Sequence, residues 1–208
     1  MTKQMGKFDD AFSITGFSKP KTVNKCEILA IIDRSGSMQR IKDDSIGGLN
    51  SFIEDQKRVD GDARLTLILF DHEFIKYLDN VDLQTVEPFN NETYVPRGTT
   101  ALLDAIGKGI STLKERKVKD KVIVAVLTDG RENASKEYRK SDILSMISEQ
   151  RKDNWEFIFL GVGEESIRDA QSIGFMGIDT MTFEPTSRGI KSGYKKMSGS
   201  TVGYRVSS

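Results

Sequence analysis

The residues with the clearest potential for chemistry follow an apolar run near the start of the chain. Residues 28–32 form a short apolar segment that is rich in β-branched side chains. The segment leads directly into Asp33, Ser35 and Ser37. A run of this kind is typical of a strand buried on both faces of a parallel sheet. Binding sites in open α/β sheets form at the carboxyl ends of such strands. The sequence therefore places a carboxylate and two hydroxyls where a site is expected.

Two later segments carry oxygen donors in equivalent positions. Thr99 and Thr100 precede an expected helix, and Asp129 follows the apolar run 121–127. A doubly wound sheet would gather these side chains at one edge with those of the first segment. Carboxylate and hydroxyl oxygens suit a hard cation, Mg²⁺ first, with Mn²⁺ and Ca²⁺ as alternatives.

Softer metals have few ligands to choose from in this chain. Cys26 is the one cysteine and His72 the one histidine, so zinc is not expected. Cys26 lies in the first apolar run and is interpreted as a small core residue. A single cysteine also excludes a disulfide within the chain.

The elements that must position these residues alternate along the chain. Hydrophobic patterns predict strands at 26–32, 64–70, 121–127, 155–160 and 181–183, and helices at 41–58, 101–117, 141–152, 164–173 and 187–197. Ser141 is the expected N-cap of the third helix. Residues 73–78 follow a strand after a link too short for a crossover, which predicts an antiparallel edge strand. The predicted fold is α/β: a doubly wound, mostly parallel, Rossmann-like central sheet with one antiparallel edge strand and helices on both faces.

Length and composition limit the number of domains and the classes of partner. The 208 residues are enough for one large domain, which we expect to occupy 25–208 after an N-terminal extension at 1–24 with a short edge strand at 12–17. Lys plus Arg and Asp plus Glu both total 31, so the net charge is zero. This balance argues against a nucleic-acid or membrane surface as the partner. No apolar run approaches the roughly 18 residues of a transmembrane helix, and no signal peptide opens the chain.

The three polar segments together resemble a known family. Residues 32–38 (Ile-Asp-Arg-Ser-Gly-Ser-Met), 94–106 and 127–130 (Leu-Thr-Asp-Gly) look like the metal-ion-dependent adhesion site of von Willebrand factor type A domains. The resemblance extends from residue 25 to the C-terminus. Residues 189–205 are similar to the last helix of small stand-alone members from bacteria and their phages. The resemblance thus implies a cytoplasmic protein of a bacterial or phage-infected cell.

The resemblance also implies a ligand set and a type of partner. Hydroxyls would bind Mg²⁺ directly, and the carboxylates would hold it directly or through water. One coordination position would remain for an acidic residue of an unidentified partner protein. Thr100 is preferred to Thr99 because the family's ligand stands immediately before the Ala-Leu-x-Asp-Ala run, although Thr99 occupies a position that is usually Gly. The implied ligands are Asp33, Ser35, Ser37, Thr100 and Asp129.

The resulting prediction is a metal-dependent protein–protein interaction module that is not an enzyme. One alternative is a metal-dependent enzyme of phosphoryl chemistry, but a phosphatase with an Asp nucleophile would want a second Asp where Ser35 stands. Nucleophile-elbow and phosphate-loop motifs are also missing from the sequence. A second alternative is a component of a nucleic-acid-associated complex. Arg34, Arg97 and Arg131 flank the expected site, where solvated loop arginines are the simpler interpretation and orientation of an acidic partner the other.

Overall fold

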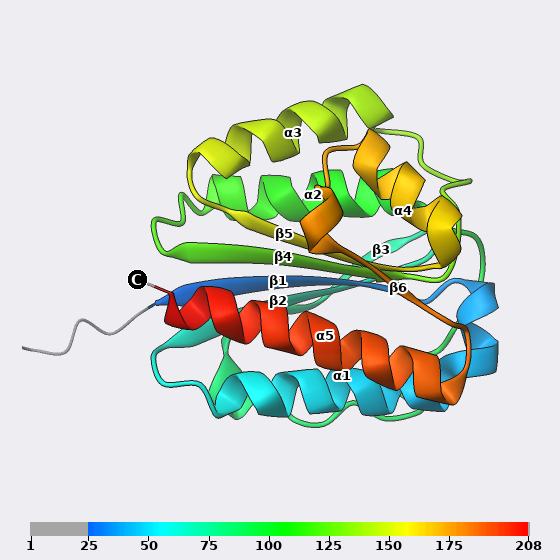
Figure 1. The fold of residues 1–208 in the computed structure, drawn as a ribbon, viewed down its shortest axis with the longest axis horizontal. Helices are drawn as coiled ribbons and strands as arrows, with labels where there is room; N and C mark the ends of the chain where they lie inside the picture. Colours follow the sequence, from blue (N-terminus) through cyan, green and yellow to red (C-terminus); the bar gives the residue numbers. More distant parts are fainter. Residues whose placement is uncertain (1–24, 208) are drawn as a thin grey trace, which may run out of the picture.

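The computed structural model describes residues 25–207, and the expected extension and its strand at 12–17 lie outside them. Six strands form one sheet in the order β3-β2-β1-β4-β5-β6 (Figure 1). All neighbours pair in parallel except β2 and β3, which are antiparallel. This confirms the predicted mostly parallel sheet with one antiparallel edge strand. The strands are β1 (Cys26–Asp33), β2 (Ala63–Phe70), β3 (Phe74–Asp82), β4 (Lys121–Thr128), β5 (Glu156–Val162) and β6 (Thr180–Phe183).

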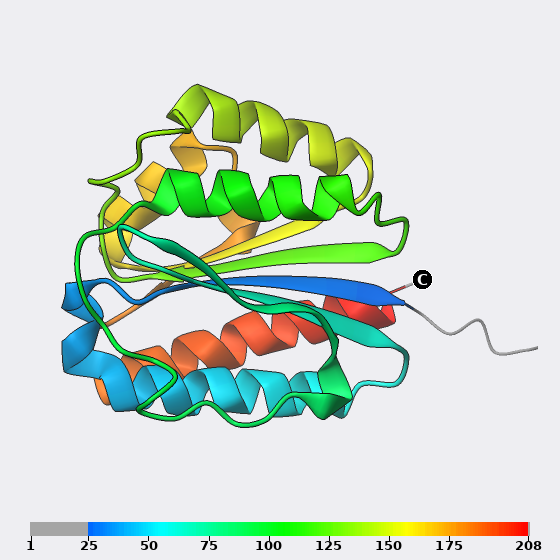
Figure 2. The same ribbon diagram turned by 180° about the vertical axis from the view of Figure 1, so that it is seen from behind.

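Five α-helices cover the two faces of the sheet. Figures 1 and 2 show α1 and α5 together on one face and α2, α3 and α4 on the other. The helices are α1 (Lys42–Lys57), α2 (Leu102–Glu115), α3 (Lys140–Lys152), α4 (Gly163–Ser172) and α5 (Ser187–Val206). Short 3-10 helices are η1 (Gly36–Ile41), η2 (Leu83–Thr85) and η3 (Gly177–Asp179). Because helices cover both faces, the central strands β1, β2 and β4 are buried along almost their whole length.

The side chains of β1 alternate between two hydrophobic cores, one on each face of the sheet. Ile28, Ala30 and Ile32 belong to the core under α1 and α5, whereas Leu29 and Ile31 belong to the core under α2, α3 and α4. Successive side chains of a strand point to opposite faces, so one apolar strand serves both cores. β1 is thereby fixed at the centre of the sheet, and its carboxyl end is held in place.

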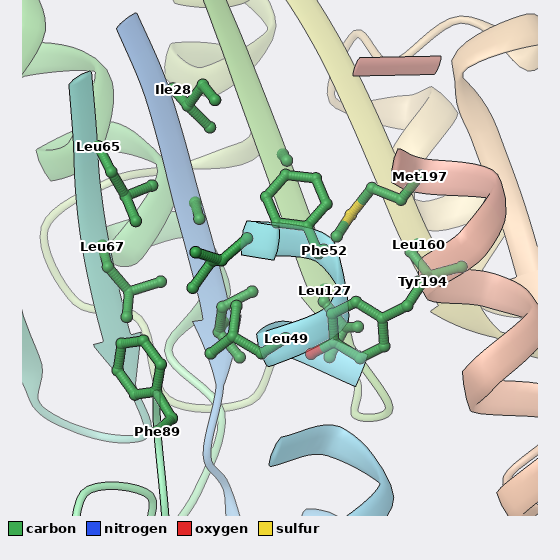
Figure 3. Close-up of a cluster of buried hydrophobic side chains, with 14 of the residues drawn as sticks. Ile28, Leu49, Phe52, Leu65, Leu67, Phe89, Leu127, Leu160, Tyr194 and Met197 are labelled. Carbon is green, nitrogen blue, oxygen red and sulfur yellow. The ribbon is translucent and has the colours of Figure 1, made fainter. Parts of the chain in front are cut away.

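Helix α5 packs closely against α1. In Figure 3, Tyr194 and Met197 of α5 lie beside Leu49 and Phe52 of α1 above the sheet. The approach depends on Gly48 of α1, where a Cβ atom would overlap the ring of Tyr194. The C-terminal helix is thus part of the core.

Several boundaries differ from the prediction, and three of them concern the helices around the site and the core. The helix expected at 41–58 is preceded by η1, which turns the chain directly after the polar segment. The third helix begins at Lys140, and its N-cap is Arg139, whose backbone N–H donates to the carboxylate of Asp142 at 2.8 Å. Ser141 is therefore inside the helix, and its prediction as N-cap was wrong. The last helix runs to Val206 instead of 197 because its later residues continue to pack against α1.

The connection from β3 to α2 runs along the outside of α1 toward the end of β1 (Figure 2). Side chains of α1 hold it there: Lys57 donates to the carbonyl of Val86 at 2.8 Å, and Asn50 both donates to and accepts from the backbone of Phe89. This anchoring brings the segment before α2 to the carboxyl edge of the sheet.

Candidate metal centre

The five predicted ligands lie at the carboxyl edge of the sheet. Asp33 ends β1, and Asp129 directly follows β4, its neighbour in the sheet. Ser35 directly precedes η1 and Ser37 lies within it. Thr100 stands two residues before α2. Three separate segments therefore contribute to one site.

Asp33 is the most enclosed of the candidates, with no exposed surface. Its Oδ1 accepts a hydrogen bond from the backbone N–H of Ser35 at 2.6 Å, and its Oδ2 accepts one from the hydroxyl of Thr128 at 2.5 Å. Burial raises the pKa of Asp33 above its ordinary 3.8, the nearby charge of Asp129 acts in the same direction, and the two hydrogen bonds act to lower it; the resulting pKa is about 6. A buried carboxylate of this kind gains from a neighbouring cation.

The two serines connect the carboxylates. The Oγ atoms of Ser35 and Ser37 are 3.1 Å apart. Ser37 also donates to Oδ1 of Asp129 at 2.5 Å. A hydroxyl that donates its hydrogen to a carboxylate keeps its lone pairs for a cation. Ser37 is exposed whereas the Asp129 side chain is buried, so the site opens to solvent on the serine side.

Thr100 completes the set from the segment before α2. It is buried, and its backbone N–H donates to Oδ1 of Asn133 at 2.9 Å. A Cβ atom placed on Gly130 would lie 2.8 Å from Oγ1 of Thr100 and 3.6 Å from both Oδ2 of Asp33 and Oγ of Ser35. Three candidate oxygens therefore surround one small space beside this glycine.

Thr99 takes a different position. It is exposed and lines a neighbouring cavity of about 380 Å³ together with Phe70 and Ala105. The hydroxyl that lies beside Gly130 is that of Thr100.

The donor chemistry fits a hard divalent cation. Two carboxylates balance a double charge, and three neutral hydroxyls add oxygen donors of the kind that Mg²⁺, Mn²⁺ and Ca²⁺ accept. Within residues 25–207 no group of three or more His, Cys, Asp and Glu side chains is arranged so that it could hold a metal ion. A metal ion here would thus depend on the hydroxyls as much as on the carboxylates.

An ion-pair network holds the segment before α2 against the end of β1. Asp71, which follows β2, is fully buried and lies 3.0 Å from Nη2 of Arg34 and 3.1 Å from Nε of Arg97. The backbone N–H of Arg97 donates to the carbonyl of Arg34 at 2.8 Å, and that of Ala101 donates to the carbonyl of Asp71 at 2.9 Å. These bonds fix Thr100 between two anchored residues. Solvation, the simpler interpretation of the loop arginines, is wrong for Arg34, whose side chain is 10% exposed.

Four residues that contact the candidate ligands or their segments are absent from the sequence-based prediction. Thr128 and Asn133 orient the ligand segments as described above, and Tyr94 donates to the carbonyl of Asp33 at 2.5 Å from 61 positions away. Arg40 pairs with Oδ2 of Asp129 at 3.2 Å. The sequence position of Thr128 could have indicated its role, because a hydroxyl at a strand end, next to a candidate ligand, can donate a hydrogen bond to a ligand carboxylate. Tyr94 lies within a segment that carried the family resemblance, but nothing in its position indicated the contact.

Comparisons with known proteins agree with the fold. The family model described as the von Willebrand factor type A domain matches residues 27–192. No curated protein sequence matches the chain. Among residues 25–207, no helix is both long and apolar enough to cross a membrane.

Several solved structures share the fold at low sequence identity. Proximal thread matrix protein 1 from the mussel byssus is 18% identical, with a TM-score of 0.59 over 86% of this chain and 46% of that one. The pilus adhesin SpaC from Lactobacillus rhamnosus GG, in an open conformation, is 13% identical, with a TM-score of 0.67 over 88% of this chain and 30% of that one. Manganese-loaded TRAP protein from Plasmodium vivax is 16% identical, with a TM-score of 0.63 over 88% and 74%. The chain thus spans less than half the length of the mussel and Lactobacillus proteins.

Proposed function

The chain belongs to the von Willebrand factor type A domain family, and we propose that it is a protein-interaction module that depends on a divalent cation. Asp33, Ser35, Ser37, Thr100 and Asp129 would hold Mg²⁺, and an acidic residue of a partner protein would take the remaining coordination position. The ion, when bound, supplies a positive centre for that carboxylate. The observation that carries the proposal is the gathering of Thr100, Asp33 and Ser35 oxygens around the space beside Gly130.

The charges at the site support capture of a carboxylate. Two ligand carboxylates neutralise the dication, and the neutral hydroxyls leave it able to attract one more anion. The solvent-facing side of the site is that of Ser37, which is exposed, so a partner would approach there. The structural neighbour TRAP is manganese-loaded, which fits a metal-binding role for this fold, and SpaC is a pilus adhesin, which fits an interaction role.

Several finer expectations stay predictions. They are the absence of enzymatic activity, the absence of direct nucleic-acid or membrane binding, and a location in the cytoplasm of a bacterial or phage-infected cell. The choice of Mg²⁺ over Mn²⁺ or Ca²⁺ belongs with them, because the donor set accommodates all three.

The first test is calorimetric titration of the metal-stripped full chain with Mg²⁺, Mn²⁺ and Ca²⁺. We expect one site, which is lost in Asp33→Asn, a variant that removes a ligand charge but keeps the side-chain shape. Asp60→Asn is the matched control, because Asp60 is exposed in the turn before β2. No binding of any of the three cations would refute the metal-dependent function.

The second test addresses the partner. The tagged chain is used to capture proteins from a bacterial lysate in Mg²⁺ and in a chelator, with Asp33→Asn as bait control. A partner that is retained in Mg²⁺, released by chelator and absent with the variant supports the proposal. A partner retained equally under all three conditions contradicts the role of the cation.

A further inference from the structure

Arg40 is bound to one of the candidate ligands. Its Nη2 lies 3.2 Å from Oδ2 of Asp129, whose Oδ1 accepts the hydrogen bond from Ser37. Among the ion pairs formed by residues 25–207, this pair alone involves a candidate ligand. The side chain of Arg40 is 57% exposed and that of Asp129 is fully buried. The guanidinium therefore reaches the buried carboxylate from the solvent side.

The two carboxylates of the site differ in the charge of their partners. Asp33 accepts from neutral groups, a backbone N–H and the hydroxyl of Thr128. Asp129 accepts from one neutral hydroxyl and from a cation. A neutral donor can remain in place when a metal ion approaches the carboxylate. A guanidinium at the same carboxylate is repelled by the dication, because like charges a few ångström apart repel even when partly solvated.

We propose that Arg40 is an internal counter-cation of the site, which competes with the divalent ion for Asp129 and thereby lowers the affinity for metal. The inference rests on the proposed function and adds a residue that sets its metal affinity. Binding of the metal ion would release the guanidinium from Asp129. Because Arg40 is largely exposed and sits in η1, it can move into solvent without disturbing the core.

Other arginines near the site provide a comparison. Arg131, adjacent to Gly130, pairs with Glu165 of α4 and is 65% exposed. It carries the same charge as Arg40 but binds no candidate ligand. A general effect of positive charge would therefore be shared by both arginines, whereas competition for Asp129 belongs to Arg40.

The test is metal titration of four metal-stripped full-length proteins by calorimetry: the unchanged chain, Arg40→Gln, Arg40→Lys and Arg131→Gln. We expect Arg40→Gln to bind Mg²⁺ and Mn²⁺ about threefold to tenfold more tightly, as loss of a partly exposed charged contact predicts. Arg40→Lys keeps the charge and should stay within about twofold of the unchanged chain. The gain in Arg40→Gln should shrink as salt is added, because screening weakens the competing ion pair. Circular dichroism melts confirm that each variant is folded.

The outcomes separate this inference from the function on which it rests. Equal or weaker metal binding by Arg40→Gln overturns the inference, and so does an equal gain in Arg131→Gln. In either case, binding by the unchanged chain that is lost in Asp33→Asn leaves the proposed function standing. If the unchanged chain binds no divalent cation, the proposed function fails and the inference fails with it.

Discussion

The hydroxyl of Thr128, at the end of β4, donates a hydrogen bond to Oδ2 of Asp33, at the end of β1, with 2.5 Å between the two oxygens. Both residues are fully buried. The contact turns the carboxylate so that its second oxygen accepts from the backbone of Ser35. One strand thus orients the ligand supplied by its neighbour.

Removal of this hydroxyl should weaken metal binding. Thr128→Val keeps the shape of the side chain but leaves Oδ2 of Asp33 without its donor. Loss of a residue that orients a ligand typically costs about 10-fold to 100-fold in metal affinity, and we expect that range for Mg²⁺ in calorimetry. Thr128→Ser retains the hydroxyl and should bind nearly as the unchanged chain does. Unchanged affinity in the valine variant would show that Asp33 does not depend on Thr128.

A methyl group at Gly130 should close the site. The backbone of Gly130 does not have a positive φ, so Ala is compatible with its conformation, yet the added Cβ would lie 2.8 Å from Oγ1 of Thr100. We expect Gly130→Ala to lose at least about 10-fold in Mg²⁺ affinity, because a ligand held out of place weakens the whole set. Gly199→Ala, in α5, is the control, since its Cβ meets nothing within 4 Å. Equal binding by the two variants would place the metal elsewhere.

Asp104 should stabilise the fold in a pH-dependent way. Its carboxylate accepts hydrogen bonds from the backbone N–H groups of Lys136, Glu137 and Tyr138, at 2.8–2.9 Å. Burial acts to raise the pKa of Asp104, but these three hydrogen bonds outweigh it and the pKa lies below its ordinary value of 3.8. The folded state therefore holds the charged form more strongly than the unfolded chain does. Its contribution to stability is present above pH 3.8 and is lost as the pH falls through the lower folded pKa.

Urea denaturation of Asp104→Asn measures this contribution. We expect a loss of about 1 kcal/mol in the free energy of unfolding at pH 7, because the three partly buried donors lose hydrogen bonds to a charged acceptor. The loss should become smaller toward pH 2, where both side chains are neutral. Asp60→Asn is again the matched control. A loss that does not change with pH would mean that the charge of Asp104 is unimportant.

Adjacent glycines of α1 should respond in opposite ways to alanine. A Cβ on Gly48 would overlap the ring of Tyr194, whereas one on Gly47 meets nothing within 4 Å. Gly48→Ala should therefore lower the free energy of unfolding by about 1–3 kcal/mol through overpacking. Gly47→Ala should raise it by about 0.4–1 kcal/mol, because it limits the freedom of the unfolded chain. Thermal melts of the pair test the close packing of α1 and α5, which equal effects would contradict.

The sequence was most informative where local pattern and tertiary position coincide. The apolar run before Asp33 predicts a buried strand. In a doubly wound sheet, the carboxyl ends of the parallel strands all lie at the same edge. The candidate ligands, which directly follow strands or precede α2, could therefore be predicted together.

The remaining features depend on contacts between distant segments. Tyr94 reaches Asp33 only because the β3–α2 connection is anchored along α1, and no local pattern encodes that path. Arg40 and Arg34 look alike in sequence as loop arginines, yet one is exposed and the other buried. The hydrophobic pattern ended the last helix at 197, although the family resemblance at 189–205 extends almost to its observed end at Val206. Thr201 and Arg205 are buried, and Arg205 donates to the carbonyl of Gln56 in α1, so contacts with another helix extend α5 beyond the local pattern.

The position of the chain ends has a practical consequence. Cys26, which opens β1, is in register with Lys121, which opens β4, and Lys121 donates to the carbonyl of Tyr204 near the end of α5 at 3.0 Å. Both ends of the described chain thus leave from the amino edge of the sheet, opposite the edge that carries Asp33 (Figure 1). A tether at either end would point the candidate metal centre away from its attachment. Immobilised protein should therefore present this face freely to molecules in solution.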